Sequence, residues 1–184
     1  MTLTPGSYRT AAYSTTGTHP NDTGQGGAGP NGNRIDTRRL VEPALRAAVD
    51  RLDPSTRLTC GYHLGFWDAD GRQATVDTDP EKPGSPSGGK GVRPSLALLS
   101  AVAAGLPTGD GVPAAVACEL VHDFSLLHDD VIDGDTERRH RPTVWARFGV
   151  ADAILAGDAL LSLANEVLGE ANSRTVPAAI RRLG

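Results

Sequence analysis

Apolar residues recur at helical spacing from about residue 37 onward. Between residues 37 and 52, the apolar positions lie three or four residues apart and form one stripe: Leu40, Val41, Leu45, Ala48, Val49 and Leu52. This spacing predicts a helix that Asp36 or Thr37 caps and that ends before Pro54. A second, shorter helix is expected over 56–67, where the apolar pattern is only partial.

The rest of the chain repeats this helical pattern. After Pro94, residues 95–104 are apolar on nearly every side, which predicts a buried helix. No segment alternates between apolar and polar residues for long, as a strand would, so the sequence predicts an all-α fold. Four more helices are expected, over about 112–130 or beyond, 143–148, 151–170 and 176–183.

Two segments lack the pattern. Residues 1–33 are rich in Gly, Ser, Thr and Asn and carry few large apolar side chains, so they cannot bury enough surface to offset the entropy of ordering. We therefore expect a disordered tail over 1–33 and a folded part over 34–184, which the motifs below indicate to be the N-terminal half of a larger domain. Residues 69–89 hold three prolines and the run GSPSGG, which predicts a long loop.

Composition narrows the function classes. The 184 residues carry 18 basic and 22 acidic side chains, a net charge of −4, which excludes a basic nucleic-acid surface as the default interpretation. Two cysteines are too few for a disulfide scaffold. The first 20 residues lack a signal-peptide core, and the longest nearly apolar run, 96–106, is too short to cross a bilayer. A cytoplasmic protein without stable membrane insertion is expected.

Asp129, Asp130 and Asp133 form a DDxxD pattern within the predicted helix at 112–130. Asp129 and Asp133 lie one turn apart and share a face, where their like charges repel. Their sequence neighbours are apolar, which argues against a freely solvated acidic face, although a helix end facing water is the alternative. Two carboxylates at this spacing suit Mg²⁺, which takes one or two protein carboxylates and completes its shell with water and phosphate oxygens.

Basic side chains stand near these aspartates. Arg138, Arg139 and Arg141 follow in one short loop, and His122 precedes Asp129 by seven residues, on the same helical face. Such a group suits a Mg²⁺-bound polyphosphate.

The segment GGKGVRP adds Lys90 and Arg93 directly before a predicted helix. Its glycines allow the backbone to approach a phosphate, and the helix start offers free N–H groups. A flexible linker is the alternative. The Walker A pattern GxxxxGK[ST] is absent from the sequence, so this segment is not a P-loop.

Together, GGKGVRP, HDFSLLHDDVIDGDTERRHRPT and AILAGDALL resemble the trans-isoprenyl diphosphate synthases, or polyprenyl synthetases. The resemblance covers about residues 62–168. It implies an all-α fold, the N-terminal part of an isoprenoid-synthase helical bundle. Two positions depart from the family pattern: Gly91 stands where GGKRxRP has Arg, and His140 stands where RRGxPT has Gly.

The resemblance also implies roles for single residues. Asp129 and Asp133 would bind Mg²⁺ with support from Asp130, and Arg138 would contact the allylic diphosphate. Phe124 and Ser125, before the aspartates, would set product length, and a large ring at Phe124 favours a short product, C15–C20 and preferably geranylgeranyl. The diphosphate of isopentenyl diphosphate would be held by Lys90, Arg93, His122 and Arg139.

The expected function is thus condensation of isopentenyl diphosphate with an allylic diphosphate. The family's second aspartate-rich motif is not found after Asp158, so the chain is expected to be a truncated or half enzyme, working as a homodimer or with a complementing C-terminal half. A non-catalytic partner subunit, a terpene cyclase and an HD-type phosphohydrolase are the alternatives. The last would use the His-Asp pairs at 122–123 and 128–129, but His63, Asp152 and Asp158 are poor candidates for its other ligands.

Overall fold

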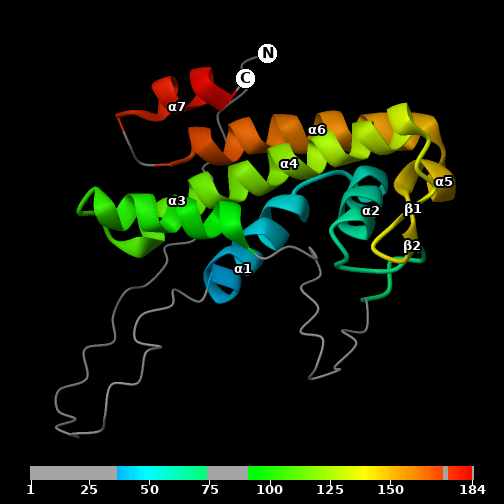
Figure 1. Cartoon of the computed structure of the whole chain (residues 1–184), viewed down its shortest axis with the longest axis horizontal. Helices are drawn as coiled ribbons and strands as arrows, with labels where there is room; N and C mark the ends of the chain where they lie inside the picture. The colour runs from blue at the N-terminus through cyan, green and yellow to red at the C-terminus, as the bar shows by residue number, and fades with distance from the viewer. Residues whose placement is uncertain (1–36, 74–90, 172–173, 184) are drawn as a thin grey trace, which may run out of the picture. The chain divides into compact units, whose positions relative to one another are not determined.

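A computed structural model describes residues 37–73, 91–171 and 174–183 of the chain (Figure 1). The predicted tail over 1–33 and most of the predicted loop over 69–89 lie outside these residues. The described elements are almost all helical, which confirms the all-α prediction. They are α1 (Thr37–Val49), α2 (Pro54–His63), α3 (Val92–Ala103), the 3₁₀ turn η1 (Thr108–Gly111), α4 (Val112–Asp133), β1 (Glu137–Arg138), β2 (Arg141–Pro142), α5 (Val144–Phe148), α6 (Val150–Gly169) and α7 (Val176–Leu183).

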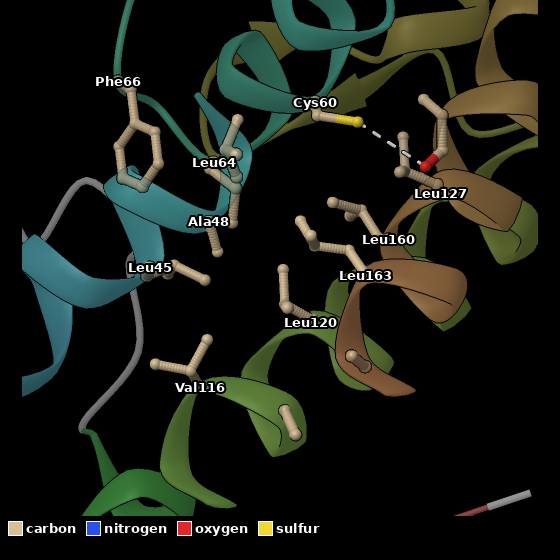
Figure 2. Packing of buried hydrophobic residues seen from close by; sticks show 14 of the residues in the cluster. Leu45, Ala48, Cys60, Leu64, Phe66, Val116, Leu120, Leu127, Leu160 and Leu163 are labelled. Carbon is tan, nitrogen blue, oxygen red and sulfur yellow. Dashed lines mark hydrogen bonds between the residues drawn. The ribbon is translucent and has the colours of Figure 1, made fainter. Parts of the chain in front are cut away.

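The long helices α4 and α6 lie side by side and run in opposite directions, and they form the centre of the fold (Figure 1). Leu120 and Leu127 of α4 are fully buried, as are Leu160 and Leu163 of α6. Burying one such leucine contributes about 1.5–3 kcal/mol. Figure 2 shows these side chains facing α1 and α2, so one apolar core joins four helices.

Helix α2 begins and ends differently from the sequence prediction. Asp53 caps it: its carboxylate accepts hydrogen bonds from the backbone N–H groups of Ser55 (3.1 Å) and Thr56 (3.2 Å). Pro54 is therefore the first residue of this helix, where its missing N–H costs nothing. The helix ends at His63 rather than at residue 67, since Gly65 takes a positive φ of 77° and turns the chain.

Helix α3 is less buried than its apolar sequence predicts. Only Pro94 and Leu98 are buried, while Leu96 (64% exposed) and Leu99 (53% exposed) face outward. The prediction of a buried helix is wrong for the described structure, because α3 packs along one side only, against α4, η1 and α1.

A short antiparallel hairpin was not predicted. Strands β1 and β2 pair Glu137 with Pro142 and Arg138 with Arg141. Two-residue strands are too short for alternation to be visible in a sequence. The hairpin directly follows α4 and holds Arg138 next to Asp130.

No helix in the described ranges is both long and apolar enough to cross a membrane.

Candidate active site

The three aspartates at the end of α4 lie in two environments. Asp130 is 1% exposed, whereas Asp129 and Asp133 are exposed to solvent. Successive side chains of a helix point about 100° apart. Asp130 therefore lies on the side of α4 that packs against the core, whereas Asp129 and Asp133 lie on the side that faces solvent. The expectation that apolar neighbours shield the Asp129–Asp133 pair is wrong here, since the adjacent Ile132 is 77% exposed.

Asp130 holds Arg138. The Nε and Nη2 atoms of Arg138 both donate to Oδ1 of Asp130, at 2.8 and 2.6 Å. These hydrogen bonds to the carboxylate raise the pKa of Arg138. The other oxygen, Oδ2, is buried and has no hydrogen-bond partner among the described residues. The middle aspartate therefore fixes an arginine beside the two exposed carboxylates.

The turn of the hairpin carries Arg139 and His140. Their φ angles are 53° and 61°, so both residues adopt the left-handed backbone conformation. The two central residues of a type I′ turn require this conformation. Glycine and asparagine adopt this conformation most easily. His140 stands at the position where the family pattern has glycine, so the departure noted in the sequence places a side chain on a strained backbone.

Arg141 has a structural role rather than a place in the arginine cluster predicted from sequence. Its Nη1 and Nη2 atoms donate to the carbonyls of Tyr62 (3.2 Å) and Trp67 (3.1 Å). Its guanidinium lies over the Tyr62 ring, 4.2 Å from the centroid, and the Tyr62 hydroxyl donates to the Pro142 carbonyl at 2.8 Å. Arg141 thus ties the hairpin to the end of α2 and the turn that follows it.

A second group of charged residues surrounds the middle of α4. Burial lowers the pKa of His122, and the positive charges of Arg93 and Arg139 lower it further. Burial raises the pKa of Glu119, and the negative charge of Asp123 adds to that effect. Arg93 and Arg139 are therefore close enough to His122 to affect its pKa.

The glycine-rich segment is described only from Gly91. Lys90 lies outside the described residues. Gly91 precedes α3 with a φ of 63°, a conformation that suits glycine, and Arg93 is exposed in the first turn of α3. The arginine of this segment therefore stands at a helix N-terminus, where N–H groups favour anions.

The two residues expected to set product length differ in their contacts. The Phe124 ring is half-buried and meets the His128 ring edge to face, with centroids 4.7 Å apart. Ser125 donates its hydroxyl to the carbonyl of His122 at 2.7 Å, a bond within the same helix.

Two histidines contribute contacts that the sequence analysis missed. The His63 side chain, 4% exposed, lies 3.3 Å from Asp123. The Nε2 atom of His128 lies 3.2 Å from the Ile154 carbonyl of α6, and its ring packs on Gly157. Neither contact has a sequence signal, because each joins residues on different helices.

Metal-binding capacity at this end of α4 is limited to a pair of carboxylates. No group of three or more His, Cys, Asp or Glu side chains that could hold a metal occurs among the described residues. The His-Asp pairs of the phosphohydrolase alternative therefore do not converge on a shared site within those ranges. Asp158 is exposed and lies 3.7 Å from His128.

The fold is all-α, and its helix α4 ends in a pair of exposed carboxylates with Arg138 beside them. The sequence model of the polyprenyl synthetase family matches residues 84–182. The chain belongs to this family.

Similar proteins agree with this assignment. The (2E,6E)-farnesyl diphosphate synthase of Mycobacterium tuberculosis is 49% identical over 144 residues, which cover 78% of this chain and 37% of that protein. The geranylgeranyl diphosphate synthase of the same organism is 44% identical over 142 residues, 77% of this chain and 38% of that protein.

Among solved structures, a polyprenyl synthetase from Streptomyces coelicolor matches with a TM-score of 0.71 and 54% identity, over 80% of this chain and 40% of its own. The chain thus spans about two-fifths of the length of these relatives.

Proposed function

We propose that this chain supplies the first metal-binding motif and the diphosphate-binding side chains of a Mg²⁺-dependent prenyltransferase. The enzyme condenses isopentenyl diphosphate with an allylic diphosphate. The observation that carries the proposal is the end of α4, where two exposed carboxylates, Asp129 and Asp133, stand next to an arginine that Asp130 holds in place. The names of the similar proteins, farnesyl and geranylgeranyl diphosphate synthases, support this substrate class.

The donor set fits Mg²⁺. Asp129 and Asp133 offer hard carboxylate oxygens one helical turn apart, and both face solvent, where water and phosphate oxygens can complete an octahedron. Asp130 supports them indirectly, because Arg138 already occupies one of its oxygens. Held by these two carboxylates, Mg²⁺ would supply positive charge to neutralise the leaving diphosphate and so favour ionisation of the allylic C–O bond.

The basic side chains bind and orient the two substrates. Arg138, fixed by Asp130, contacts the allylic diphosphate without having to be ordered first, which is how preorganised charges contribute to catalysis. The second diphosphate, that of isopentenyl diphosphate, is held by Lys90, Arg93, His122 and Arg139.

The reaction needs little covalent participation from the protein. The allylic C–O bond breaks and its electron pair leaves with the diphosphate. The double bond of isopentenyl diphosphate then forms a new C–C bond to the allylic carbon, and a proton leaves the neighbouring carbon for the departed diphosphate. The side chains of this site hold the two reactants close and in register.

We infer a short product, C15–C20, with geranylgeranyl diphosphate favoured. Phe124 lies five residues before Asp129 on α4, and its ring packs edge to face against the His128 ring. In this position the ring would close the hydrocarbon tunnel after a few isoprene units. Phe124→Ala should lengthen the product by one or more units, as measured by chromatography of the dephosphorylated products. Ser125→Ala tests the second of the two expected product-length positions in the same assay. An unchanged product length in Phe124→Ala would leave Phe124 as a core residue only.

The enzyme is proposed to act in the cytoplasm as a homodimer or with a complementing C-terminal half. The test is an assay with isopentenyl diphosphate, an allylic diphosphate and Mg²⁺, on the chain alone and with the C-terminal half of a polyprenyl synthetase added. Turnover in either mixture supports the proposal. Mg²⁺-dependent diphosphate binding without any turnover would point instead to the non-catalytic partner subunit.

Asp129→Ala provides the matched site variant. It should abolish Mg²⁺-dependent diphosphate binding, measured by calorimetry, because one carboxylate alone holds the ion weakly. Asp152→Ala removes an exposed carboxylate from α6 and should leave binding unchanged. Binding that survives Asp129→Ala would contradict the metal assignment.

A further inference from the structure

The start of α5 holds the loop that joins the two charged parts of the site. Asp133 is the last residue of α4 and Arg138 lies on β1, so only residues 134–137 separate this carboxylate from the arginine. In the middle of this loop, the Asp135 carbonyl accepts two side-chain hydrogen bonds. The Thr143 hydroxyl and the Trp145 indole N–H both donate to it, each at 2.8 Å. Two side chains at the start of α5 therefore grip one backbone atom of the loop.

The backbone of this loop is fixed at its neighbouring positions as well. The N–H groups of Gly134 and Asp135 both donate to the Asp130 carbonyl of α4. The Thr143 N–H donates to the Thr136 carbonyl at 3.0 Å, which adds one more hydrogen bond beside the paired residues of the hairpin. The loop is thus tied to α4 where it begins and to α5 in its middle.

The two bonds to the Asp135 carbonyl do more than satisfy an acceptor. Asp135 is exposed, so water could serve its carbonyl, and a protein donor adds little net stability there. Instead, side chains take both lone pairs of the oxygen. Thr143 is 3% exposed and Trp145 is half-buried against the core, so both donors start from a rigid part of the fold. This arrangement selects one conformation of a loop that solvent alone would leave free.

The loop determines where the side chain of Arg138 starts. The guanidinium at the far end of that side chain is fixed by Asp130, with Nη2 2.6 Å from Oδ1. The backbone at the near end follows directly from the loop that Thr143 and Trp145 hold. Both ends of the arginine are therefore placed relative to α4, and with them the gap between Arg138 and the exposed carboxylate of Asp133.

We propose that Thr143 and Trp145 are positioning residues, which set the distance between the metal-binding carboxylate of Asp133 and the diphosphate-binding guanidinium of Arg138. This inference rests on the proposed function. A diphosphate that bridges a metal ion and an arginine needs both at a fixed separation. Hydrogen bonds already formed in the free protein supply that order in advance, so binding does not have to create it.

The first test measures the loop without any ligand. Trp145→Phe keeps an aromatic ring and removes the N–H donor, and Thr143→Val removes the hydroxyl at nearly constant volume. In each variant, the Asp135 amide hydrogen should exchange with solvent about three- to tenfold faster, the range that one lost hydrogen bond gives. Thr143→Ser keeps the hydroxyl and should restore the slower exchange. Exchange is followed by NMR on the 184-residue chain.

The second test measures binding of inorganic diphosphate in the presence of Mg²⁺ by calorimetry. Trp145→Phe should weaken this binding by about tenfold, as the loss of a group behind a binding residue does. The matched control is Trp67→Phe, since the Trp67 indole also donates to a backbone carbonyl, that of Leu58 at 2.9 Å, but in the turn after α2. This control loses the same kind of hydrogen bond and should bind diphosphate as the natural chain does.

Three results would overturn the positioning role. They are an unchanged exchange rate of Asp135 in Trp145→Phe, faster exchange with unchanged diphosphate affinity, and an equal loss of affinity in Trp67→Phe. The last would show that general destabilisation explains the effect. A natural chain that fails to bind Mg²⁺ and diphosphate would contradict the proposed function instead, and the exchange rates alone then decide whether α5 holds the loop.

Discussion

At the scale of single residues, Gly157 decides how closely α6 approaches the aspartate-bearing helix. A Cβ atom at this position would overlap the His128 ring, which also lies within hydrogen-bond distance of the Ile154 carbonyl and packs on Phe124. We expect Gly157→Ala to lower the free energy of unfolding by about 1–3 kcal/mol, because the ring or the helix must shift. Urea denaturation followed by circular dichroism measures this change.

Gly169 is the matched control for this prediction. It also lies on α6, but a Cβ there meets no atom within 4 Å. Gly169→Ala should leave stability unchanged or raise it by up to about 1 kcal/mol, since alanine restricts the unfolded chain. If both variants have the same stability, the contact with His128 does not limit the approach of the helices.

At the scale of elements, the hairpin between α4 and α5 carries a backbone strain that its sequence does not relieve. His140 holds a φ of 61° although its side chain is fully exposed and makes only a 3.8 Å contact with Glu137. His140→Gly should stabilise the chain by about 0.5–1 kcal/mol, because glycine adopts the left-handed conformation without steric cost. Thermal unfolding measures the gain. His140→Ala removes the same side chain and keeps the strain, so equal stability of the two variants would disprove the explanation.

The cap of α2 predicts a pH dependence. Hydrogen bonds from Thr56 and Ser55 lower the pKa of Asp53 from 3.8 to about 2. Because the folded-state pKa is the lower one, the stabilisation by the charged cap is complete above pH 3.8 and is lost as the pH falls through about 2. The stability advantage of the natural chain over Asp53→Asn should therefore shrink between about pH 4 and pH 2, as measured by chemical denaturation at each pH. A constant difference would show that Asp53 acts through packing alone.

At the scale of the whole molecule, stability depends on the α4–α6 core rather than on surface ion pairs. Leu160 is fully buried between these helices and α2 (Figure 2). Leu160→Ala should lower the free energy of unfolding by about 2–5 kcal/mol through lost burial and a cavity. Arg51 bridges the end of α1 to Glu166 and Glu170 on the surface, and Arg51→Ala should cost no more than about 1 kcal/mol. Denaturant unfolding compares the two, and a reversed order would contradict this account.

Much of this architecture was predictable because helices leave a local signal. The apolar periodicity located α4, α6 and α7 nearly to their ends, and the motif around Asp129 indicated the family. Two of the wrong predictions were decided by contacts that are not local. Leu96 and Leu99 are exposed because α3 packs against other elements on one side only. The apolar periodicity of α3 does not show which of its sides other elements cover. The role of Arg141 depends on two carbonyls near the end of α2, about 75 residues earlier in the sequence.

The sequence by itself determined the fold class and the family, and it indicated the DDxxD aspartates and Arg138 of the proposed site. Each of these follows from spacing along the chain, which fixes the faces of a helix before any helix packs. Only the tertiary structure decided which charged residue does what. Three aspartates in one motif differ because the packing of α4 buries one and exposes two. Three arginines in one loop differ because Arg138 contacts Asp130, Arg139 lies exposed at the turn of the hairpin, and Arg141 anchors the hairpin to the end of α2.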